Sequence, residues 1–321
     1  MRLLVIGGTV FLGRHVVETA LARGHAVTVF HRGQHGRAHP DAETLIGDRT
    51  SDLSALAGRE WDAVVDTCGF EPESVVLTAG ALAGHVGHYG FVSSVSAYAD
   101  WPGAPVDEDA PTFDTAEREY GPMKAACERA AEAAMPGRVL VARAGVIVGP
   151  HENIGRLPWW LRRLAEGGET LAPGPPGAPI QLIDARDLAA WMLDMAEAGR
   201  GGAYNAIAEL GSATWGELLE TAREVTGGGA ELRWTDLAVI EERVEEPWEA
   251  LPLWPIPSLP ALYRIAGAKA AAAGLAPRSL RATIEDTWAW LAAGGELDDW
   301  RRELRVTGLP ADQERALLRA S

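Results

Sequence analysis

A glycine-rich turn near the N-terminus constrains the fold of this chain more than any other feature. The segment Gly7-Gly8-Thr9-Val10-Phe11-Leu12-Gly13 directly follows an apolar run at residues 3–6 and opens a helical pattern at residues 12–23. Backbone N–H groups at a helix N-terminus, together with the helix dipole, favour a phosphate group. Glycines permit the tight turn and the close approach of a pyrophosphate. The turn predicts a dinucleotide site, and a strand–helix turn without a ligand is the alternative.

Short apolar runs alternate with helical patterns through the first half of the chain. The runs are rich in β-branched residues and almost continuously hydrophobic, as in strands covered on both faces, and they lie at residues 3–6, 27–30, 63–66, 89–92 and 139–142. The helical patterns lie at residues 12–23 (ending at Gly24), 72–82 and 117–134. This order predicts an α/β fold with a doubly wound parallel sheet of the Rossmann type.

The regular alternation of apolar runs and helical patterns ends after residue 150, which suggests a second, smaller and mainly helical lobe. We expect helices at 158–165, 187–198, 215–225, 240–244 and 280–291, strands at 180–183, 204–207 and 231–234, and loops at 167–179 and 247–260. The second loop holds five prolines, Pro247, Pro252, Pro255, Pro257 and Pro260. The predicted nucleotide-binding domain is 1–150, completed by about 180–208, and the predicted substrate lobe is 151–179 and 209–321.

Charge and cysteine content exclude several classes of protein. The chain has 29 Lys and Arg against 45 Asp and Glu, and this acidity argues against a nucleic-acid partner, which needs clustered positive charge. No apolar run approaches the ~20 residues of a membrane span, and the N-terminus begins as a strand rather than as a targeting segment. Only 2 cysteines occur, and no Cys/His cluster has metal-ligand spacing. We therefore expect a cytoplasmic protein without a metal.

The end of the second strand predicts which dinucleotide binds. An acidic residue there would accept hydrogen bonds from a free ribose 2′-hydroxyl, whereas an arginine would accommodate a 2′-phosphate. The chain has His31-Arg32-Gly33 at this point. Arg32 therefore favours NADP(H), with NAD(H) left open, and a solvated surface arginine is the alternative. Asp48, which lies between the apolar runs at 27–30 and 63–66, could bond the adenine amino group or simply form a turn.

A tyrosine and a lysine stand four residues apart in the third predicted helix. Tyr120 and Lys124 therefore leave the same helix face. A phenol has a pKa of about 10, and a nearby ammonium stabilises the phenolate and lowers that pKa. Proton transfer to a carbonyl or carbinol oxygen requires such a pair. The alternative is an incidental pair on a helix surface.

A cluster of serines follows the apolar run at residues 89–92, at the sheet edge that faces the ligand crevice. A hydroxyl there can hydrogen-bond the substrate oxygen and stabilise charge that develops on it. Ser94 is the chosen candidate, with Ser93 and Ser96 as competitors. Serines that merely cap a turn are the alternative.

Together these motifs carry a family resemblance. The glycine turn, His31-Arg32-Gly33, Ser93-Ser94, Tyr120 to Lys124, and residues 143–150 and 181–188 occur in the family's order and span about two-thirds of the chain. The chain resembles the extended and atypical short-chain dehydrogenase/reductase superfamily, in particular the NAD(P)-dependent epimerase/dehydratase-like group that includes isoflavone-reductase-like proteins.

The resemblance implies an enzyme with a triad. Ser94 would hold the substrate oxygen, Tyr120 would act as acid and base, and Lys124 would bond the nicotinamide ribose and tune Tyr120. The expected cofactor-binding residues lie in the glycine turn, at the strand ends and on the catalytic helix: Gly7, Thr9, Val10, Phe11, Leu12, Gly13, His31, Arg32, Asp48, Thr67, Tyr120 and Lys124.

The chain also departs from the family pattern. Val10 replaces the usual middle glycine of the extended-family turn. The sugar 4,6-dehydratases carry an Asp-Glu pair directly after the hydroxyl residue, where this chain has Val95 and Ser96. The departure at these two positions argues against dehydratase chemistry.

The substrate lobe combines tryptophans and arginines. An aromatic or apolar substrate would suit Trp159, Trp160, Trp248 and Trp254, whereas a nucleotide sugar would need converging arginines such as Arg156, Arg162 and Arg163. Packing inside the lobe core is the alternative for the tryptophans.

The preferred function is an NADP(H)-dependent oxidoreductase that acts on a small carbonyl or hydroxyl substrate. A nucleotide-sugar epimerase with tightly bound NAD and a non-catalytic NADP-binding sensor are the two alternatives. A homodimer is compatible with either enzyme.

Overall fold

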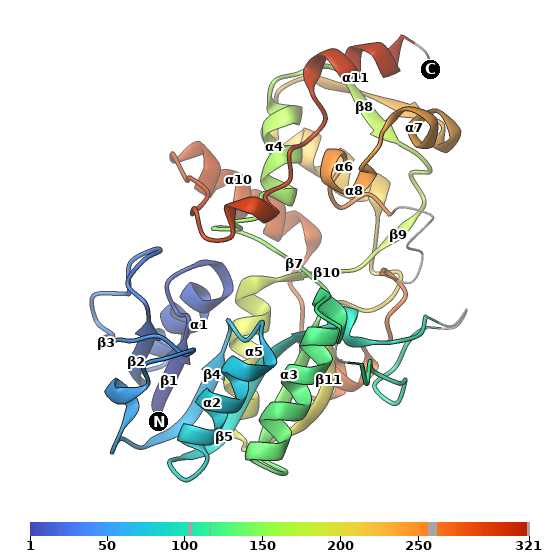
Figure 1. Ribbon diagram of the computed structural model, residues 1–321. Coiled ribbons are helices and arrows are strands. Elements are labelled where there is room, and N and C mark those ends of the chain that lie inside the picture. Colours follow the sequence, from blue (N-terminus) through green and yellow to red (C-terminus); the bar gives the residue numbers. More distant parts are fainter. Residues whose placement is uncertain (102–104, 116, 256–261, 320–321) are drawn as a thin grey trace.

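A computed structural model describes residues 1–101, 105–115, 117–255 and 262–319 (Figure 1). The first part of the chain forms β1 (Arg2–Ile6), α1 (Phe11–Ala22), β2 (Ala26–His31), β3 (Glu43–Ile46), β4 (Trp61–Asp66), α2 (Pro72–Leu82), β5 (Val86–Ser94), α3 (Tyr120–Ala134) and β6 (Val139–Ala144). Three short 3-10 helices are η1 (Ser54–Leu56), η2 (Val95–Ala97) and η3 (Arg302–Leu304).

The second part of the chain continues with shorter strands and with the helices of the lobe. These are β7 (Val146–Val148), α4 (Arg156–Ala165), β8 (Gly168–Pro173), β9 (Pro179–Ile180), β10 (Leu182–Asp184), α5 (Ala185–Glu197), β11 (Gly202–Ala206), β12 (Ala213–Thr214), α6 (Trp215–Thr226), β13 (Ala230–Thr235), α7 (Leu237–Arg243), α8 (Pro247–Ala250), α9 (Ala268–Ala272), α10 (Leu280–Ala292) and α11 (Ala311–Leu318).

The central sheet has 7 strands in the order β3-β2-β1-β4-β5-β6-β11. Every neighbouring pair is parallel. The order reverses direction between β1 and β4, and in such sheets the ligand crevice opens at this point, outside the carboxyl ends of the strands. The predicted fold class, a doubly wound parallel sheet with a smaller helical lobe, is confirmed.

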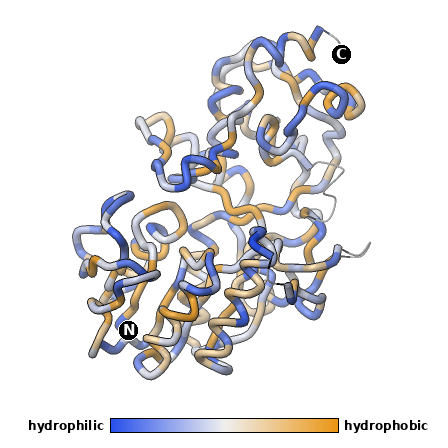
Figure 2. Tube along the Cα trace, in the orientation of Figure 1, coloured by the Kyte–Doolittle hydropathy of each residue, from blue (hydrophilic) through white to orange (hydrophobic). Residues whose placement is uncertain are grey.

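Both faces of the sheet are buried, which explains the nearly continuous hydrophobicity of its strands (Figure 2). Because successive side chains of a strand point to opposite faces, Leu3 and Val5 of β1 join a cluster with α1 and α5. Leu4 and Ile6 join a second cluster with α2 and α3 on the other face. Packing of the helices on both faces therefore fixes the positions of the strand ends, and of the turns that follow them, relative to one another.

The helix that carries the tyrosine begins later than the sequence pattern predicts. The expected start at residue 117 is wrong, because α3 begins at Tyr120. Tyr120 therefore occupies the first turn of the helix, next to the turns that follow the sheet. Its spacing to Lys124 within the helix is as predicted. Gly24 ends the first helix with a φ of 77°, also as predicted.

The lobe differs from the sequence expectation in three places. The expected loop at 167–179 contains β8, because its residues pair in parallel with β13 and bury Leu171 and Ala172. The expected strand at 180–183 is split at Gln181, whose side chain bonds the backbone of Ala208 and Ile265. The proline-rich stretch opens with α8, and Pro257 and Pro260 lie outside the described residues.

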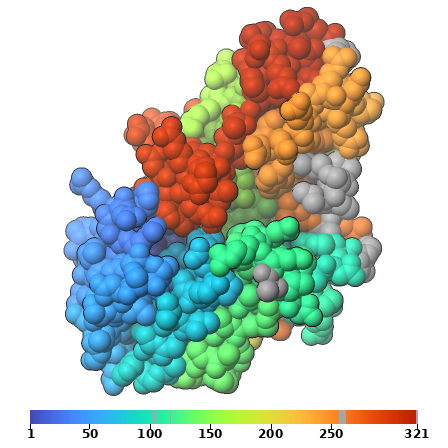
Figure 3. Space-filling view, viewed as in Figure 1, coloured from blue at the N-terminus to red at the C-terminus, as the bar shows by residue number. Residues whose placement is uncertain are grey.

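A third hydrophobic cluster forms the core of the lobe, from α4, α6, α10 and residues of β7 and β8. Within the described residues, no helix is long and apolar enough to cross a membrane. The red C-terminal residues of the lobe rest against the blue and cyan N-terminal domain in Figure 3. This contact brings the lobe over the carboxyl ends of the sheet.

Candidate active site

The glycine turn after β1 has the geometry that a pyrophosphate requires. Gly7 has a φ of 89°, which residues with a side chain rarely adopt. A Cβ atom on Gly13 would collide with the carbonyl oxygen of Gly7, so α1 can approach the turn only with glycine there. The residue before the helix, Val10, makes no side-chain hydrogen bond to its first N–H groups. These N–H groups are therefore available to a ligand.

The end of β2 holds an unpaired donor. His31 Nδ1 accepts a hydrogen bond from the Gly33 N–H at 3.1 Å, which leaves the proton on Nε2. That Nε2 atom is buried and has no partner in the described residues. Burial lowers the pKa of His31, so the ring is neutral. A bound ligand would satisfy this N–H group.

Arg32 and Asp48 lie close together beyond the ends of β2 and β3. Asp48 Oδ1 accepts hydrogen bonds from the backbone and hydroxyl of Thr50, at 2.9 and 2.7 Å. These bonds lower the pKa of Asp48, and the charge of Arg32 contributes to the same shift. The turn role considered for Asp48 is thus present, while its second oxygen makes no hydrogen bond in the described residues. Arg32 is exposed.

A buried ion pair lies under the same crevice, and the sequence reading missed it. Arg49 donates to both oxygens of Asp66, at 2.7 and 2.8 Å. Tyr89 donates to the same carboxylate at 2.6 Å, and Arg49 also contacts the thiol of Cys68 at 3.4 Å. Burial alone would raise the pKa of Asp66, but the charge and hydrogen bonds of Arg49 outweigh it, and the pKa is lowered. The pair ties the loop after β3 to the end of β4.

Thr67 occupies the bottom of the glycine turn. Its hydroxyl donates to the Ile6 carbonyl oxygen at 3.0 Å. A Cβ atom on Gly13 would meet the same hydroxyl at 2.9 Å. Thr67 therefore lies against the turn that would hold a pyrophosphate.

The sequence did contain a signal for the buried pair of Arg49 and Asp66. Arg49 directly follows Asp48, and the next strand along the chain ends in Asp66.

Tyr120 and Ser94 meet at the carboxyl end of β5. The Tyr120 side chain is 45% exposed, whereas Ser94 is 8% exposed. Burial raises the pKa of Tyr120, while a hydrogen bond with Ser94 and the charges of Arg301 and Arg156 act to lower it. Because much of the tyrosine is exposed, water screens part of the burial effect. Of the three candidate serines, Ser94 is the one placed beside the phenol.

Lys124 is buried one helical turn after Tyr120, at 3% exposure. Its ammonium donates to the carbonyl oxygens of Gly69 and Val92, at 2.8 and 2.6 Å. Burial lowers its pKa to about 8. Without a bound cofactor, burial is the largest influence on the Tyr120 pKa and raises it. That Lys124, together with an oxidised cofactor, lowers the phenol pKa stays a prediction.

Glu128 joins the strand of Ser94 to the helix of Tyr120, and the sequence reading missed it too. Glu128 lies one turn after Lys124 and accepts a hydrogen bond from Ser93 at 2.5 Å. Arg143 of β6 donates to the same carboxylate at 2.9 Å. Ser93 is therefore engaged with Glu128, whereas Ser94 hydrogen-bonds the phenol. Its four-residue spacing from Lys124 was the available signal.

The four tryptophans considered for the substrate pack in or against the core of the lobe, with Trp159 and Trp248 only partly buried. Trp160 and Trp254 are fully buried in the lobe cluster, so the packing alternative holds for them. The argument for an aromatic or apolar substrate loses its support at these two positions. Nor do the arginines of α4 converge, because Arg163 pairs with Glu314 at 2.8 Å and Arg162 is exposed. Arg156 alone of the three lies near Tyr120.

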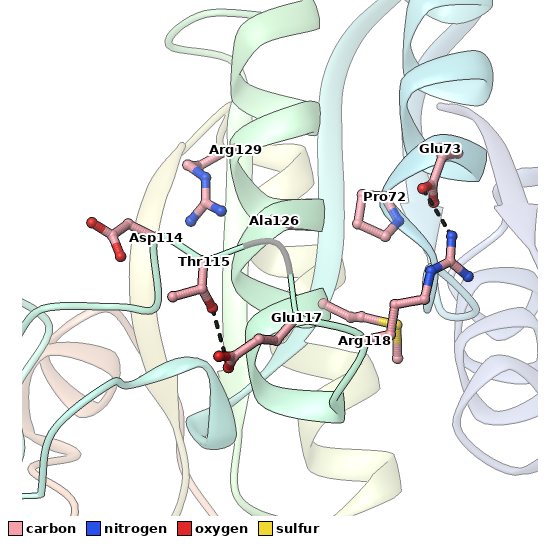
Figure 4. A pocket seen from close by; sticks show the side chains of 9 residues that line it. Pro72, Glu73, Asp114, Thr115, Glu117, Arg118, Ala126 and Arg129 are labelled. Carbon is pink, nitrogen blue, oxygen red and sulfur yellow. Dashed lines mark hydrogen bonds and ion pairs between the residues drawn. The ribbon is translucent and has the colours of Figure 1, made fainter.

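Two surface cavities are lined by none of the predicted site residues. One, of about 310 Å³, lies between α2 and the start of α3 (Figure 4) and is lined by Pro72, Glu73, Asp114, Thr115, Glu117, Arg118, Met123, Ala126 and Arg129. In it, Arg118 pairs with Glu73 at 3.2 Å. The other, of about 370 Å³, lies between Asp184 at the end of β10 and Arg278 before α10.

The parallel sheet, the glycine cradle and the Ser94–Tyr120–Lys124 grouping define a class, the NAD(P)-dependent enzymes of the short-chain dehydrogenase/reductase superfamily. The orphaned N–H of His31 and the cradle at Gly7 and Gly13 fit a dinucleotide cofactor. Residues 3–90 and 85–208 match the model of the NAD dependent epimerase/dehydratase family. The chain belongs to this family.

Similar proteins of known sequence cover a small part of the chain. A segment of 73 residues is 50% identical to the human sterol-4-alpha-carboxylate 3-dehydrogenase, decarboxylating, and covers 23% of this chain and 19% of that protein. A segment of 71 residues is 39% identical to the Bos taurus protein of the same name and covers 22% of this chain and 20% of that protein. The matches therefore span about one fifth of these curated relatives.

Solved structures resemble the chain over most of its length. The Bordetella bronchiseptica enzyme WbmH in complex with NAD+ has a TM-score of 0.68 at 19% identity and covers 92% of this chain and 99% of that one. The UDP-glucose 4-epimerase of Thermotoga maritima, solved with UDP-glucose, has a TM-score of 0.69 at 17% identity and covers 92% and 100%. At this identity the likeness establishes the shared fold.

Proposed function

We propose that this chain is an NADP(H)-dependent oxidoreductase that interconverts a carbinol and a carbonyl group of a small substrate. The observation that carries the proposal is that Tyr120 lies within hydrogen-bonding reach of Ser94 at the end of β5, while the buried ammonium of Lys124 bonds the Val92 carbonyl oxygen of the same strand. A hydroxyl pair at the carboxyl end of β5 can bind one substrate oxygen and exchange a proton with it.

Each residue has a role that follows from its position. Ser94 donates a hydrogen bond to the substrate oxygen, and Tyr120 gives that oxygen a proton or takes one from it. Lys124 would bond the nicotinamide ribose and, together with an oxidised cofactor, stabilise the phenolate of Tyr120. Hydride transfer is the chemistry that the bound dinucleotide supplies. The glycine turn, with Thr67 below it, would hold the pyrophosphate.

The preference for NADP(H) rests on Arg32. The residue is exposed at the end of β2, and no acid follows that strand to accept hydrogen bonds from a free 2′-hydroxyl. Asp48 lies near enough to Arg32 to feel its charge, so both residues flank the space that an adenosine would occupy. His31 offers its buried N–H to the same ligand.

Cofactor binding tests this preference directly. We expect the protein to bind NADPH more tightly than NADH, and Arg32→Ala to lose about tenfold or more of its NADPH affinity, as expected for a lost charge-assisted contact. Arg37→Ala, which removes an exposed arginine from the same loop, is the matched control. Equal affinities in the wild-type protein would contradict the preference.

Turnover tests the chemistry. Tyr120→Phe should lower kcat on a panel of alcohols by about 10²- to 10⁴-fold while cofactor affinity is kept. Tyr204→Phe is the control, because the Tyr204 ring lies edge-to-face with Trp191, with ring centres 5.7 Å apart, in the middle of β11. Full activity of Tyr120→Phe would refute the assignment.

A nucleotide-sugar epimerase is the second candidate, and the solved epimerase structures with the same fold favour it. Such an enzyme would be purified with oxidised NAD and would cause no net consumption of NADPH. Analysis of the cofactor released from the purified protein distinguishes the two functions.

A further inference from the structure

A segment near the C-terminus reaches from the lobe to the loop after β4. The ring of Trp300 lies 5.6 Å from the ring of Phe70, and the guanidinium of Arg301 lies 4.3 Å from the centre of the same ring. The ammonium of Lys124 lies 5.2 Å from that centre. The side chains of Arg301 and Lys124 therefore both contact the ring of Phe70, at the edge of the candidate active site.

The Arg301 guanidinium makes no hydrogen bond among the described residues, although the backbone carbonyl oxygen accepts one from the Leu304 N–H. Its nearest carboxylate oxygen belongs to Glu303, at 3.9 Å, and its side chain is only 27% exposed. Its backbone has a φ of 54°, a conformation that is uncommon for residues with a side chain. None of its nitrogens is among the buried atoms without a partner in the described residues, so its N–H groups are open to water that a ligand could replace.

Arg156 approaches the same place from α4. Asn153 donates to the carbonyl oxygen of Trp300 at 3.0 Å, which joins the start of α4 to the segment of Arg301. Arg156 Nε donates to Glu152 at 2.9 Å and one terminal nitrogen donates to Ile147 at 2.8 Å. Its other terminal nitrogen makes no hydrogen bond among the described residues.

Both guanidinium groups lie close enough to the phenol for their charges to act on it, because Arg301 and Arg156 act to lower the pKa of Tyr120 against the effect of burial. An anionic group held by these arginines would therefore lie near the oxygen that Tyr120 protonates. An anionic group at the far end of a long substrate would lie too far from the Tyr120 oxygen to be held by these arginines.

We propose that Arg301, supported by Arg156, binds a carboxylate that the substrate carries next to its reacting carbinol or carbonyl carbon. The planar fork of a guanidinium matches the two oxygens of a carboxylate. The inference rests on the proposed function, because it identifies the class of substrate for that site. The enzyme would select hydroxy acids or oxo acids over neutral alcohols and ketones.

Matched substrate pairs test the selection. We would compare 3-hydroxybutyrate with 2-butanol, and 2-hydroxycyclohexanecarboxylate with cyclohexanol, by kcat/KM for reduction of NADP+. The wild-type protein should prefer the acids, and Arg301→Gln should reduce that preference by about tenfold or more, as expected for loss of a charge-assisted contact. The neighbouring, exposed arginine provides the control, because Arg302→Gln should keep the preference.

Calorimetric titration with malonate, in the presence of NADP+, provides a measurement that does not depend on turnover. Malonate should bind the wild-type protein and Arg302→Gln alike and Arg301→Gln about tenfold more weakly. Unchanged malonate binding in Arg301→Gln would overturn the proposal. So would a loss of UDP binding in Arg301→Gln with malonate binding unchanged, because the arginine would then serve a diphosphate.

The two levels of inference fail differently. If no alcohol is oxidised but malonate binding depends on Arg301, the anion site is supported and the oxidoreductase function is contradicted. If neutral alcohols are oxidised as well as acids, the oxidoreductase function is supported and the carboxylate site is overturned.

Discussion

Removal of the cation from the buried Arg49–Asp66 pair should be one of the most destabilising single changes in the nucleotide-binding domain. Arg49→Met keeps the length of the side chain but removes both hydrogen bonds to Asp66, at 2.7 and 2.8 Å. Asp66 is 0% exposed, so its charge would be left in the interior. Tyr89 and the backbone N–H of Cys68 would be its only remaining hydrogen-bond donors among the described residues.

The expected loss in the free energy of unfolding is about 3–5 kcal/mol, the usual cost of breaking a buried ion pair by removing one partner. Arg59→Met is the matched control, because Arg59 pairs with Glu43 at a comparable 2.7 Å but the two side chains are 40% and 50% exposed. That change should cost about 0–1 kcal/mol. Urea unfolding followed by circular dichroism measures both.

The pH dependence gives a second test. In the wild-type protein the pKa of Asp66 is below its unfolded value of about 3.9. The pair therefore adds stability above that pH, which is lost as the pH falls through the folded pKa. In Arg49→Met, burial without the cation raises the Asp66 pKa, so protonation relieves the cost. The difference between the two proteins should shrink as the pH falls from neutral.

A double variant completes the experiment. Arg49→Met with Asp66→Asn removes the buried charge and keeps an acceptor for Tyr89, so it should recover most of the lost stability. A loss below about 1 kcal/mol for Arg49→Met, or no recovery in the double variant, would refute the reasoning.

Three further predictions follow from the same packing. Gly13→Ala should remove measurable dinucleotide binding in a fluorescence titration, because the new Cβ would collide with the Gly7 carbonyl oxygen; retained affinity would contradict the cradle. Glu128→Gln should move the alkaline limb of the kcat/KM profile to lower pH, because the Glu128 charge supports the Lys124 pKa of about 8, whereas Glu132→Gln on the exposed face of α3 should not. Trp160→Ala should cost about 3–5 kcal/mol in urea unfolding, since the side chain is 0% exposed in the lobe core, and a loss under half of that would argue against a packing role.

Local patterns in the sequence predicted most of the sheet and part of the site. Strands buried on both faces reveal themselves by composition, and glycines at a strand–helix turn reveal a conformation that other residues avoid. The pairing of Tyr120 with Lys124 is local as well, because a four-residue spacing within a helix brings two side chains to one face. The same locality explains why Pro72–Leu82 was predicted with its observed bounds.

Features that depend on distant partners could not be read in this way. Strand β8 lies in a stretch rich in glycine and proline, and it forms because β13 supplies its hydrogen bonds. Ser93 and Ser94 are equivalent in the sequence, and only the position of Glu128 on α3 engages one and leaves the other for the phenol. Trp160 and Trp254 could face a substrate or a core until the lobe is packed.

The amino-acid sequence by itself therefore determined the sheet, the glycine turn after β1 and the spacing of the phenol and the ammonium, because each depends on backbone geometry within a few residues. The tertiary structure decided the Arg49–Asp66 pair, the serine beside Tyr120 and the arginines that face it. Arg301 reaches Phe70 across more than two hundred residues of chain. Contacts at that separation are set by how helices and strands pack, and no local pattern encodes them.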